Sequence, residues 1–526
     1  MVAGVELPIN TSATAIQMAE AIFGDGVTVV SASYTGDPDS SGIYTDGDAI
    51  APDVTPSDTG VLFSTGDLSG FTNNNPAESN QATNTTTASS GPNNLADFNA
   101  AAGANTFDAS FLDVDFIPTG NQMTMEFVFA SEEFPEFATG AFQDFVGVWI
   151  NGTFVELGVG DGDIDPANLN AGSNANLFVD NTADQFNTEM DGFTLTLSLT
   201  IPVNSGVTNS IRIGIADVAD NNFDSTLLIA GDSVQTTLVA NDDTSNLFPT
   251  GSRTLDVLAN DVNATGGTLS ISKINGQDVP PGGGSFVLAT GQTVTVNSDG
   301  TITVDGDGDV ETVNFTYEVE STTGATDVGF VTLNSVPCFV YGTMIMTEQG
   351  ERPVEDLRPG DMILTRDEGF RPLRWVGSRE VAGKGDFAPI CIRANTFGKH
   401  EELWLSPLHR VLVRDSLAEL LFGEAEVLVA AKDLVNDHSV RRIEQTKVGY
   451  FHLLFDRHQV VFSEGLPTES FLPGPQIKDS FEADILAEIC TLFPEIDPET
   501  AEGYSPAARR MLRQYEAQLL SQKWVA

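Results

Sequence analysis

The stretch Cys338-Phe339-Val340-Tyr341-Gly342-Thr343-Met344-Ile345-Met346-Thr347 marks the point where the character of this chain changes. Upstream of it the only basic residues are Arg212, Arg253 and Lys273, and every other Lys and Arg lies downstream. At 526 residues the chain is too long for one ordinary hydrophobic core, so several domains are expected. The shift in composition predicts that a new domain starts at Cys338.

The net charge of the chain limits the classes of molecule that it is expected to bind. The formal net charge is −51, and most of the acidic residues precede residue 338. Phosphate groups would be repelled, so neither nucleic acid nor an anionic membrane is expected as a partner. Such acidity is typical of a soluble extracellular protein in a salty, calcium-containing medium, although a simple gain in solubility explains it equally well. The hydrophobic fraction of 41% is enough to form buried cores.

The sequence shows no pattern of a disulfide framework, an N-terminal secretory signal or a transmembrane segment. Cys338, Cys391 and Cys490 are too few and too scattered for a disulfide framework. Residues 1–10 contain no basic region and no long apolar core, so no ordinary secretory signal is expected, and export would use another signal, such as a C-terminal one. No run approaches the ~18 apolar residues that span a bilayer, so no transmembrane segment is expected.

Two tandem β-sandwich-like domains are predicted upstream, over residues 1–238 and 239–336. Short alternating runs separated by Gly, Asn and Asp clusters indicate strands. In the first domain such runs begin at Val27, Met123, Phe193 and Ile211; in the second they cover Thr254–Leu258, Thr268–Ile274, Thr293–Val296, Thr301–Val304 and Asn314–Val319. One short helix is expected at Ala13–Phe23, and residues 71–105 are expected to form a surface loop.

Residues 338–474 are predicted to form a third, all-β domain, because Gly-Asp turns separate short strands and charges of both signs mix. Residues 475–526 are predicted to form a short helical tail. In it, Asp479–Cys490 and Pro506–Leu520 carry apolar residues at helical spacing. The predicted fold class is therefore mainly β.

The first domain resembles the choice-of-anchor L family of bacterial surface proteins over residues 10–235. The segments that carry the resemblance are Thr65-Gly66-Asp67, Phe129-Ala130-Ser131-Glu132-Glu133-Phe134, Asp144-Phe145, Asp191-Gly192-Phe193-Thr194 and Ile215 to Ser225. The resemblance implies an extracellular display or adhesion module on a bacterium, secreted or at the cell surface, and not a reaction. Its partner would be an unknown extracellular ligand or surface.

Acidic residues gather after two predicted strands of this domain. Glu132 and Glu133 follow one strand, while Asp217, Asp220 and Asp224 crowd the turn after another. Carboxylates brought together repel one another unless a cation or solvent separates them, and Ca²⁺ takes about six to eight oxygen ligands from such loops. Calcium in the N-terminal β domains and a solvated acidic turn are both open interpretations.

The second domain resembles a cadherin-like module of bacterial adhesins. The matching segments are Ala240-Asn241-Asp242-Asp243, Asp256 to Asp261, Asn297 to Thr301 and Phe315-Thr316-Tyr317. The resemblance implies a spacer or a binding sandwich.

From Cys338 the chain resembles the Hint superfamily, the autoprocessing fold of Hedgehog proteins and inteins, over residues 338–474. Three blocks carry the match: Cys338 with Gly342-Thr343 and Gly350 to Asp361; Leu405-Ser406-Pro407-Leu408-His409-Arg410-Val411; and Tyr450 to Val461 with Glu464-Gly465 and Thr468-Glu469-Ser470. The blocks occur in the order of the family.

The residue types fit that chemistry. A thiol is the best side-chain nucleophile at neutral pH, and Cys338 Sγ can reach the carbonyl carbon of Pro337 through a five-membered ring. Attack converts the Pro337–Cys338 amide into a thioester. The departing amine needs a proton, and His409 is the candidate acid because a histidine titrates near neutral pH. The reaction needs no cofactor.

Three further residues are candidates for this site. The hydroxyl of Ser406 could bond the tetrahedral oxygen or hold His409. Asp456 could position the thiol or accept its proton, and His458 is a second acid–base candidate, ahead of His452. The ordinary alternative is that such a histidine is a buried or surface residue without a chemical role, and Cys391 and Cys490 are interpreted as buried hydrophobic residues.

The domain departs from the family pattern in two ways: residue 406 is Ser where Thr is usual, which preserves the hydroxyl, and the closing asparagine is missing. Splicing ends with cyclisation of a terminal asparagine, but no asparagine follows Asn436. Cleavage or transfer of the upstream part therefore remains, with the thioester resolved by water or another small nucleophile. Pro337 is also a slow acyl donor, because its carbonyl is constrained.

The leading hypothesis is a secreted or surface protein that processes itself in cis at Pro337–Cys338, rather than a turnover enzyme. The alternative is a calcium-dependent surface adhesin that carries an inactive Hint scaffold. A conventional protease is weaker, because a nucleophile at the start of a domain suits a reaction in cis.

Overall fold

The computed structural model describes residues 2–81, 84–138, 140, 142–160, 162–247, 252–307, 312–334, 339–383, 388–436, 438–472, 505, 507–512 and 517. Pro337 and Cys338 lie outside these ranges, as does the predicted helix Asp479–Cys490. The chain divides into two compact units. The first comprises residues 1–243, 254–303 and 313–332, and the second comprises residues 244–253, 304–312 and 333–526.

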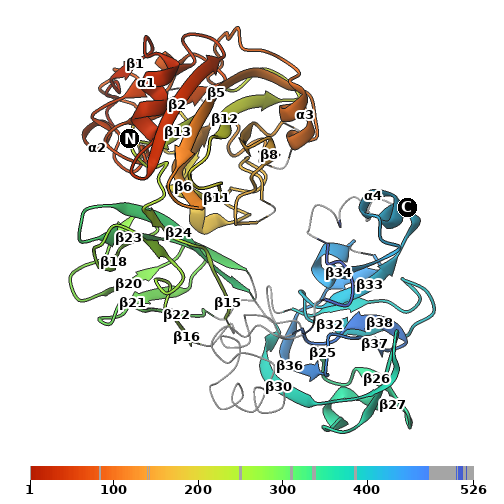
Figure 1. Cartoon of the computed structure of the whole chain (residues 1–526). Helices are drawn as coiled ribbons and strands as arrows, with labels where there is room; N and C mark the ends of the chain where they lie inside the picture. The colour runs from red at the N-terminus through yellow and green to blue at the C-terminus, as the bar shows by residue number, and fades with distance from the viewer. Residues whose placement is uncertain are drawn as a thin grey trace. The chain divides into compact units, whose positions relative to one another are not determined.

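The first domain is a sandwich of two antiparallel sheets (Figure 1). The larger sheet has the strand order β1-β3-β4-β13-β6-β10-β9, with β11 also paired to β6, and the smaller has the order β2-β5-β12-β7-β8. The strands are β1 (Ile9–Asn10), β2 (Val27–Thr35), β3 (Ser41–Tyr44), β4 (Gly60–Ser64), β5 (Thr106–Pro118), β6 (Gln122–Ser131), β7 (Phe145–Ile150), β8 (Thr153–Phe154), β9 (Phe178–Asp180), β10 (Gly192–Thr194), β11 (Leu197–Pro202), β12 (Asn209–Val218) and β13 (Ser225–Ala230). The predicted strand runs at Val27, Met123 and Ile211 are confirmed, and the run that begins at Phe193 is divided between β10 and β11.

The core of the first domain lies between its two sheets. Phe127 of β6, Leu112 of β5 and Ile213 of β12 are buried in one cluster. Because successive side chains of a strand point to opposite faces, the neighbours Asp113 and Asp115 on β5 lie on the outer face of the smaller sheet.

Two helices flank this sandwich. Helix α1 (Ala15–Ile22) confirms the predicted helix, and Thr14 caps it in a reciprocal box with Gln17. Helix α3 (Ala96–Ala102) lies within residues 71–105, where only a surface loop was predicted. It forms because Phe98 buries itself beside Phe111 and Trp149 on the outer face of the smaller sheet. The remaining helical turns are α2 (Gly47–Ile50), η1 (Leu68–Gly70) and η2 (Ala175–Leu177).

The second domain is also built from antiparallel sheets. One sheet has the order β15-β24-β23-β18-β19, a second has β16-β22-β21-β20, and β14 pairs with β17. The strands are β14 (Leu238–Val239), β15 (Asp243–Asn246), β16 (Ser252–Leu255), β17 (Val262–Asn263), β18 (Leu269–Ile274), β19 (Gln277–Asp278), β20 (Gly284–Val287), β21 (Thr293–Val296), β22 (Ile302–Asp305), β23 (Val313–Ser321) and β24 (Thr326–Asn334). The five predicted runs coincide wholly or in part with β16, β18, β21, β22 and β23.

The third domain packs a six-stranded sheet, β30-β36-β25-β32-β31-β35, with an eight-stranded one, β27-β26-β28-β37-β38-β33-β34, in which β29 pairs with β28. The elements are β25 (Phe339–Val340), β26 (Met344–Thr347), β27 (Gly350–Pro353), η3 (Val354–Asp356), β28 (Met362–Thr365), β29 (Gly369–Pro372), β30 (Trp375–Gly383), β31 (Ile390–Ile392), β32 (Leu403–Leu405), β33 (Arg410–Arg414), α4 (Ser416–Phe422), β34 (Glu426–Ala430), η5 (Ala431–Leu434), β35 (Val440–Arg442), β36 (Gln445–Leu454), β37 (Val460–Ser463) and β38 (Leu466–Glu469). The mainly β fold class is confirmed.

A short segment of the predicted helical tail departs from the prediction. The Leu428 N–H on β34 donates to the Arg510 carbonyl at 2.8 Å, and the Leu512 N–H donates back to Leu428 at 2.9 Å. These bonds form a parallel bridge between Leu428 and Met511. Strand β34 ends its sheet, so its backbone groups are open to such pairing. Most of the tail lies outside the described residues.

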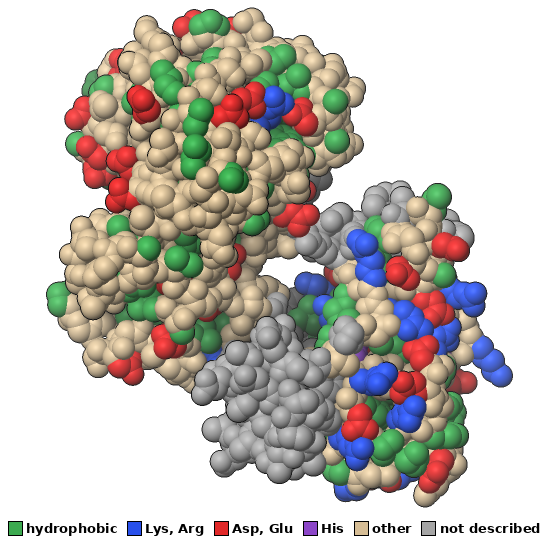
Figure 2. All heavy atoms as spheres, viewed as in Figure 1, with side chains coloured by type: hydrophobic (Ala, Val, Ile, Leu, Met, Phe, Trp, Pro, Cys, Tyr) green, Lys and Arg blue, Asp and Glu red, His purple; other side chains and the backbone are tan. Residues whose placement is uncertain are grey.

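The two units differ in surface charge. Figure 2 shows Lys and Arg side chains gathered on the second unit, whereas the visible face of the first unit carries few of them among its acidic side chains. This contrast follows from the sequence, in which nearly all Lys and Arg residues lie downstream of Cys338. Within the part of the chain that the structure describes, no helix combines the length and the apolar character needed to cross a bilayer.

Candidate functional site

Strand β25 brings the start of the third domain into the middle of its six-stranded sheet. Phe339 pairs with Leu405 of β32 on one side and with Phe451 of β36 on the other. Its side chain is 1% exposed. Strand pairing on both sides fixes the backbone of Phe339, including the nitrogen through which it is bonded to Cys338.

His409 lies against Phe339. The two ring centroids are 4.3 Å apart, with an interplanar angle of 59°, and the His409 side chain is buried. The loop that carries the imidazole is fixed by backbone bonds: the His409 N–H donates to the Ser406 carbonyl at 3.1 Å, and the His409 carbonyl accepts from Ala431 at 3.0 Å. The structure therefore places one predicted catalytic histidine against the residue that follows Cys338.

Ser406 belongs to the same loop. It directly follows Leu405, the β32 residue paired with Phe339, and it is 4% exposed. The register of β25 with β32 thus brings the Ser406–His409 loop and the start of the domain together. Thr343 closes the following turn, because its hydroxyl donates to the Val340 carbonyl at 2.7 Å.

Asp456 forms an ion pair at the surface of the domain. Both of its carboxylate oxygens accept hydrogen bonds from Arg374, at 2.7 Å and 2.9 Å, and its side chain is 56% exposed. The Asp456 carboxylate raises the pKa of Arg374. These contacts describe a surface ion pair between the end of β36 and the start of β30, which favours a structural role.

His458 is also held by structural contacts. Its Nδ1 accepts the Ala508 N–H at 2.9 Å, so Nε2 carries the proton and donates to the Ser470 carbonyl at 3.1 Å. Burial lowers the pKa of His458 to about 4. A neutral ring with both nitrogens engaged does not fit the predicted acid–base role. Instead it binds the tail segment to the domain.

The structure adds Glu469, a residue to which no role was assigned. Its carboxylate is buried and accepts the backbone N–H of Arg410 at 2.9 Å, and Arg410 Nη1 lies 3.5 Å from the same oxygen. Burial raises the pKa of Glu469, and Arg410 opposes that rise. The other oxygen lies 3.6 Å from His458 Nε2. The sequence did contain a signal for this residue, because Glu469 is a charged residue within the Thr468-Glu469-Ser470 block.

The two glutamates of the predicted calcium set are buried in the first domain. Glu132 and Glu133 are each 1% exposed, and neither Glu132 oxygen makes a hydrogen bond of normal geometry. Burial raises the pKa of Glu132 to about 9, Asp191 adds to the rise, and Thr85 opposes it. Burial also raises the pKa of Glu133 to about 9, and Asp144 adds to it.

The remaining members of this predicted metal set are held by protein groups. Asp224 accepts hydrogen bonds from the Thr87 N–H and hydroxyl. Asp217 is buried beside Asp144, and burial raises its pKa. Asp220 caps its own turn by accepting the Asn222 N–H at 3.0 Å. No group of three or more acidic, His or Cys side chains within the described ranges is arranged to hold a metal ion, so calcium at this place stays a prediction.

Comparison with protein families assigns each domain. A choice-of-anchor L domain matches residues 8–235, a bacterial Ig domain matches residues 232–334, and a Hint domain matches residues 337–475. Among solved structures, the chain is similar to the crystal structure of the gp41-1 intein, with 11% identity and a TM-score of 0.17, over 25% of this chain and 97% of the intein chain. Comparison with curated proteins finds no match.

These findings define a multidomain, mainly β protein with a Hint domain. More particularly, the chain combines a choice-of-anchor L domain, a bacterial Ig-like domain and a Hint domain in that order. The first and third agree with the resemblances found in the sequence. The middle domain is matched as a bacterial Ig domain, where the sequence suggested a cadherin-like module; both are β-sandwiches.

Proposed function

We propose that this protein cleaves itself after Pro337 by an acyl shift to the thiol of Cys338, and so separates the acidic β domains from the Hint domain. The observation that carries the proposal is the packing of the His409 ring on the ring of Phe339. Consecutive Cα atoms are ~3.8 Å apart, so Cys338 is tethered within one residue of that contact.

The first step exchanges an amide for a thioester. The Cys338 thiolate attacks the carbonyl carbon of Pro337, and the bond from that carbon to the Cys338 nitrogen breaks. The His409 imidazole accepts the thiol proton as the thiolate forms, and the resulting imidazolium gives that proton to the departing nitrogen, which leaves as an amine and is thereby a poorer nucleophile for the reverse reaction. The Ser406 hydroxyl, in the same loop, is the proposed donor to the tetrahedral oxygen.

The second step resolves the thioester. Water, or a small nucleophile, attacks the Pro337 carbonyl and releases residues 1–337 as an acid or an adduct. The Cys338 thiol is regenerated, so hydrolysis as a whole consumes one water. The contacts of Asp456 and His458 favour structural roles, and the proposal therefore assigns proton transfer to His409 alone. Splicing is not proposed, because no asparagine follows Asn436.

The upstream domains suit this outcome. Choice-of-anchor L and bacterial Ig domains are typical of secreted or surface proteins of bacteria. Cleavage would release, or transfer to an acceptor, a strongly acidic β module in that setting. We therefore propose that the protein is secreted or displayed and that its processing sets the form in which the module is presented.

Intact-mass spectrometry of the purified full chain, with and without dithiothreitol, tests the proposal. Wild-type protein should yield fragments of 337 and 189 residues, as cleavage after Pro337 requires. Cys338→Ala should stay intact, whereas Cys391→Ala, which alters a buried thiol on β31, should cleave normally. His409→Ala should block cleavage, and His438→Ala, in an exposed turn, should not. Wild-type protein that stays intact through long incubation with thiol would falsify the proposal.

A second candidate function is a calcium-dependent surface adhesin whose Hint domain is an inert scaffold. The observation that favours it is the burial of the two adjacent carboxylates of Glu132 and Glu133, each 1% exposed. Calcium titration followed by thermal melting tests it, and an unchanged melting temperature removes the metal from this function.

A further inference from the structure

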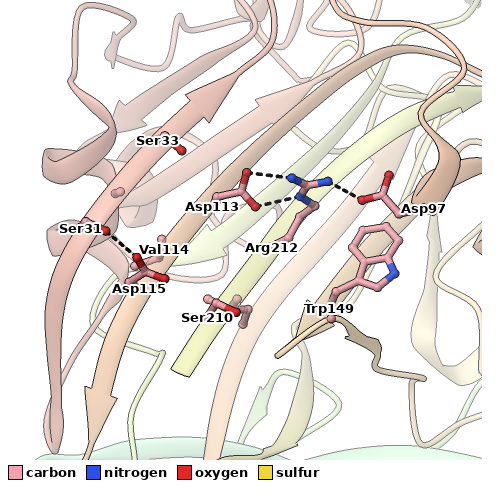
Figure 3. Close-up of a pocket in the computed structure, with 12 residues that line it drawn as sticks. Ser31, Ser33, Asp97, Asp113, Val114, Asp115, Trp149, Ser210 and Arg212 are labelled. Atoms are coloured by element: carbon pink, nitrogen blue, oxygen red, sulfur yellow. Dashed lines mark hydrogen bonds and ion pairs between the residues drawn. The ribbon is translucent and has the colours of Figure 1, made fainter. Parts of the chain in front are cut away.

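The outer face of the smaller sheet in the first domain carries a cavity that the proposed self-cleavage does not use. Its volume is about 400 Å³, within the range of small-molecule sites. It lies over β2, β5 and β12, with Trp149 of β7 and Asp97 of α3 at its side (Figure 3). The floor is a rigid sheet, which suits a preformed site.

Sheet register aligns the polar side chains of this cavity in two cross-strand rows. In one row Ser33, Asp113, Arg212 and Trp149 are successive partners across β2, β5, β12 and β7. In the other row Ser31, Asp115 and Ser210 are successive partners. Because residues directly opposite each other project to the same side, both rows line one surface.

Arg212 is fixed in the middle of this surface. Its Nε and Nη2 donate to the two oxygens of Asp113 at 2.8 Å and 2.9 Å, and Nη1 donates to Asp97 of α3. Its guanidinium carbon lies 4.3 Å from the centre of the Phe111 ring. Figure 3 shows the guanidinium between the two carboxylates. The three side chains are about a third exposed, so a ligand can still reach them.

The second row is less constrained. Ser31 donates to Asp115 at 2.8 Å, and both residues are exposed. Trp149, at the other side, lies over Gly147, where even a Cβ would meet the indole ring at 2.1 Å. The cavity thus combines an aromatic edge, a fixed ion network and open hydroxyl and carboxylate groups.

The hydrogen-bonding inventory selects a class of ligand. Asp113 and Asp115 only accept, Arg212 only donates, and the serine hydroxyls do both. A ligand whose every polar group both donates and accepts satisfies such a surface, and a sugar hydroxyl has that property. Three carboxylates against one guanidinium leave the cavity net negative, so phosphate, sulfate and uronic acid groups are disfavoured.

We propose that this cavity binds a neutral carbohydrate. Vicinal hydroxyls of one sugar ring would donate to Asp113 and Asp115 and accept from Arg212 and the serines, and the ring would lie across the strands between the two rows. The site is independent of the chemistry at Cys338, so its success or failure leaves self-cleavage untouched.

Affinity electrophoresis of the full chain tests the proposal, with Cys338→Ala as background so that the chain stays in one piece. Native gels would contain dextran, galactomannan or xyloglucan, and a parallel gel would contain alginate, a polyuronate. We expect retardation in at least one neutral polysaccharide and none in alginate. Asp115→Ala should weaken the retardation about tenfold, because it removes an accepting charge.

Asp115 suits this test because it is exposed and its side chain bonds only Ser31 among the contacts described, so the variant should fold. Asp113→Asn is a second variant that keeps the shape of the side chain. Asp278→Ala, an exposed aspartate on β19, is the matched control and should bind as the parent does. Retardation by none of the neutral polysaccharides, equal retardation of the Asp115→Ala and Asp113→Asn variants and their parent, or tighter binding to alginate would each overturn the proposal.

Discussion

The ring of His409 lies 4.3 Å from the ring of Phe339, centre to centre, and this contact joins a loop of the Hint domain to the second residue of that domain. The two residues are far apart in sequence, and strand pairing of Phe339 with Leu405 brings them together. The position of the imidazole relative to the start of strand β25 thus depends on the packing of one aromatic side chain.

Phe339→Leu should slow self-cleavage. Leucine fills most of the buried volume but removes the ring that supports His409, so we expect the cleavage rate to fall about tenfold while the domain stays folded. The rate would be followed by mass spectrometry on freshly purified protein. Phe370→Leu, on exposed strand β29, is the control. An unchanged rate in Phe339→Leu would show that the contact does not position the acid.

His458→Ala should lower stability without a direct effect on the chemistry. The change leaves the Ser470 carbonyl and the Ala508 N–H without their ring partner, which costs about 1–3 kcal/mol for each group that stays buried. Urea unfolding of the Cys338→Ala chain measures it, with His438→Ala as control. A variant that is fully stable but does not cleave would return His458 to the catalytic residues.

The same histidine predicts a dependence of stability on pH. Its pKa is about 4 in the folded chain, below the ordinary value of 6.5 that it regains on unfolding, so the folded chain binds fewer protons between these values. The free energy of unfolding should therefore fall as pH drops from about 6.5 to about 4, by on the order of 3 kcal/mol. The His458→Ala variant should show a flatter profile over this window, and identical profiles would contradict the assignment.

Glu469→Ala should destabilise the Hint domain more strongly than Glu469→Gln. Removal of the carboxylate leaves the Arg410 backbone N–H without its buried acceptor and the partly exposed guanidinium without its partner, a loss of about 1–3 kcal/mol. Glutamine keeps an acceptor for the N–H. Because Arg410 follows His409, both variants should also slow cleavage, in the same order. Thermal melting and the cleavage rate would be measured on the same preparations, and equal effects of the two variants would count against this role.

The buried Glu132 and Glu133 predict a loss of stability at alkaline pH. Their pKa values are about 9 in the folded chain, above the ordinary value of 4.5 that they regain on unfolding, so the folded chain binds more protons between these values. The free energy of unfolding of the first unit should therefore fall as pH rises from about 4.5 to about 9. Glu132→Gln should flatten this profile, and Glu156→Gln serves as a control. If calcium binds here, millimolar CaCl₂ should raise the melting temperature most at high pH, where the carboxylates are ionised.

Local signals in the chain predicted the strands and the helix near the N-terminus. Alternation in β2, β6 and β12 and the helical spacing of apolar residues in α1 are local signals, and these elements appear in the structure where they were expected. Helix α3 was missed because its stability comes from Phe98 packing on a sheet that the local sequence does not reveal. The bridge of Met511 to Leu428 was missed for the same reason, since an open sheet edge is a tertiary feature.

Sequence by itself determined the domain order, the presence of a cysteine at a domain boundary and the lack of any asparagine after Asn436, because residue identity and covalent order carry those facts. Only the tertiary structure decided which candidates stand together. In the structure, the His409 ring packs on Phe339 and Asp456 pairs with Arg374. Both ring nitrogens of His458 are engaged in hydrogen bonds. The physical reason is that hydrogen bonds and ring contacts act over a few ångströms, and the residues that make them are joined by strand register and burial rather than by neighbourhood in the chain.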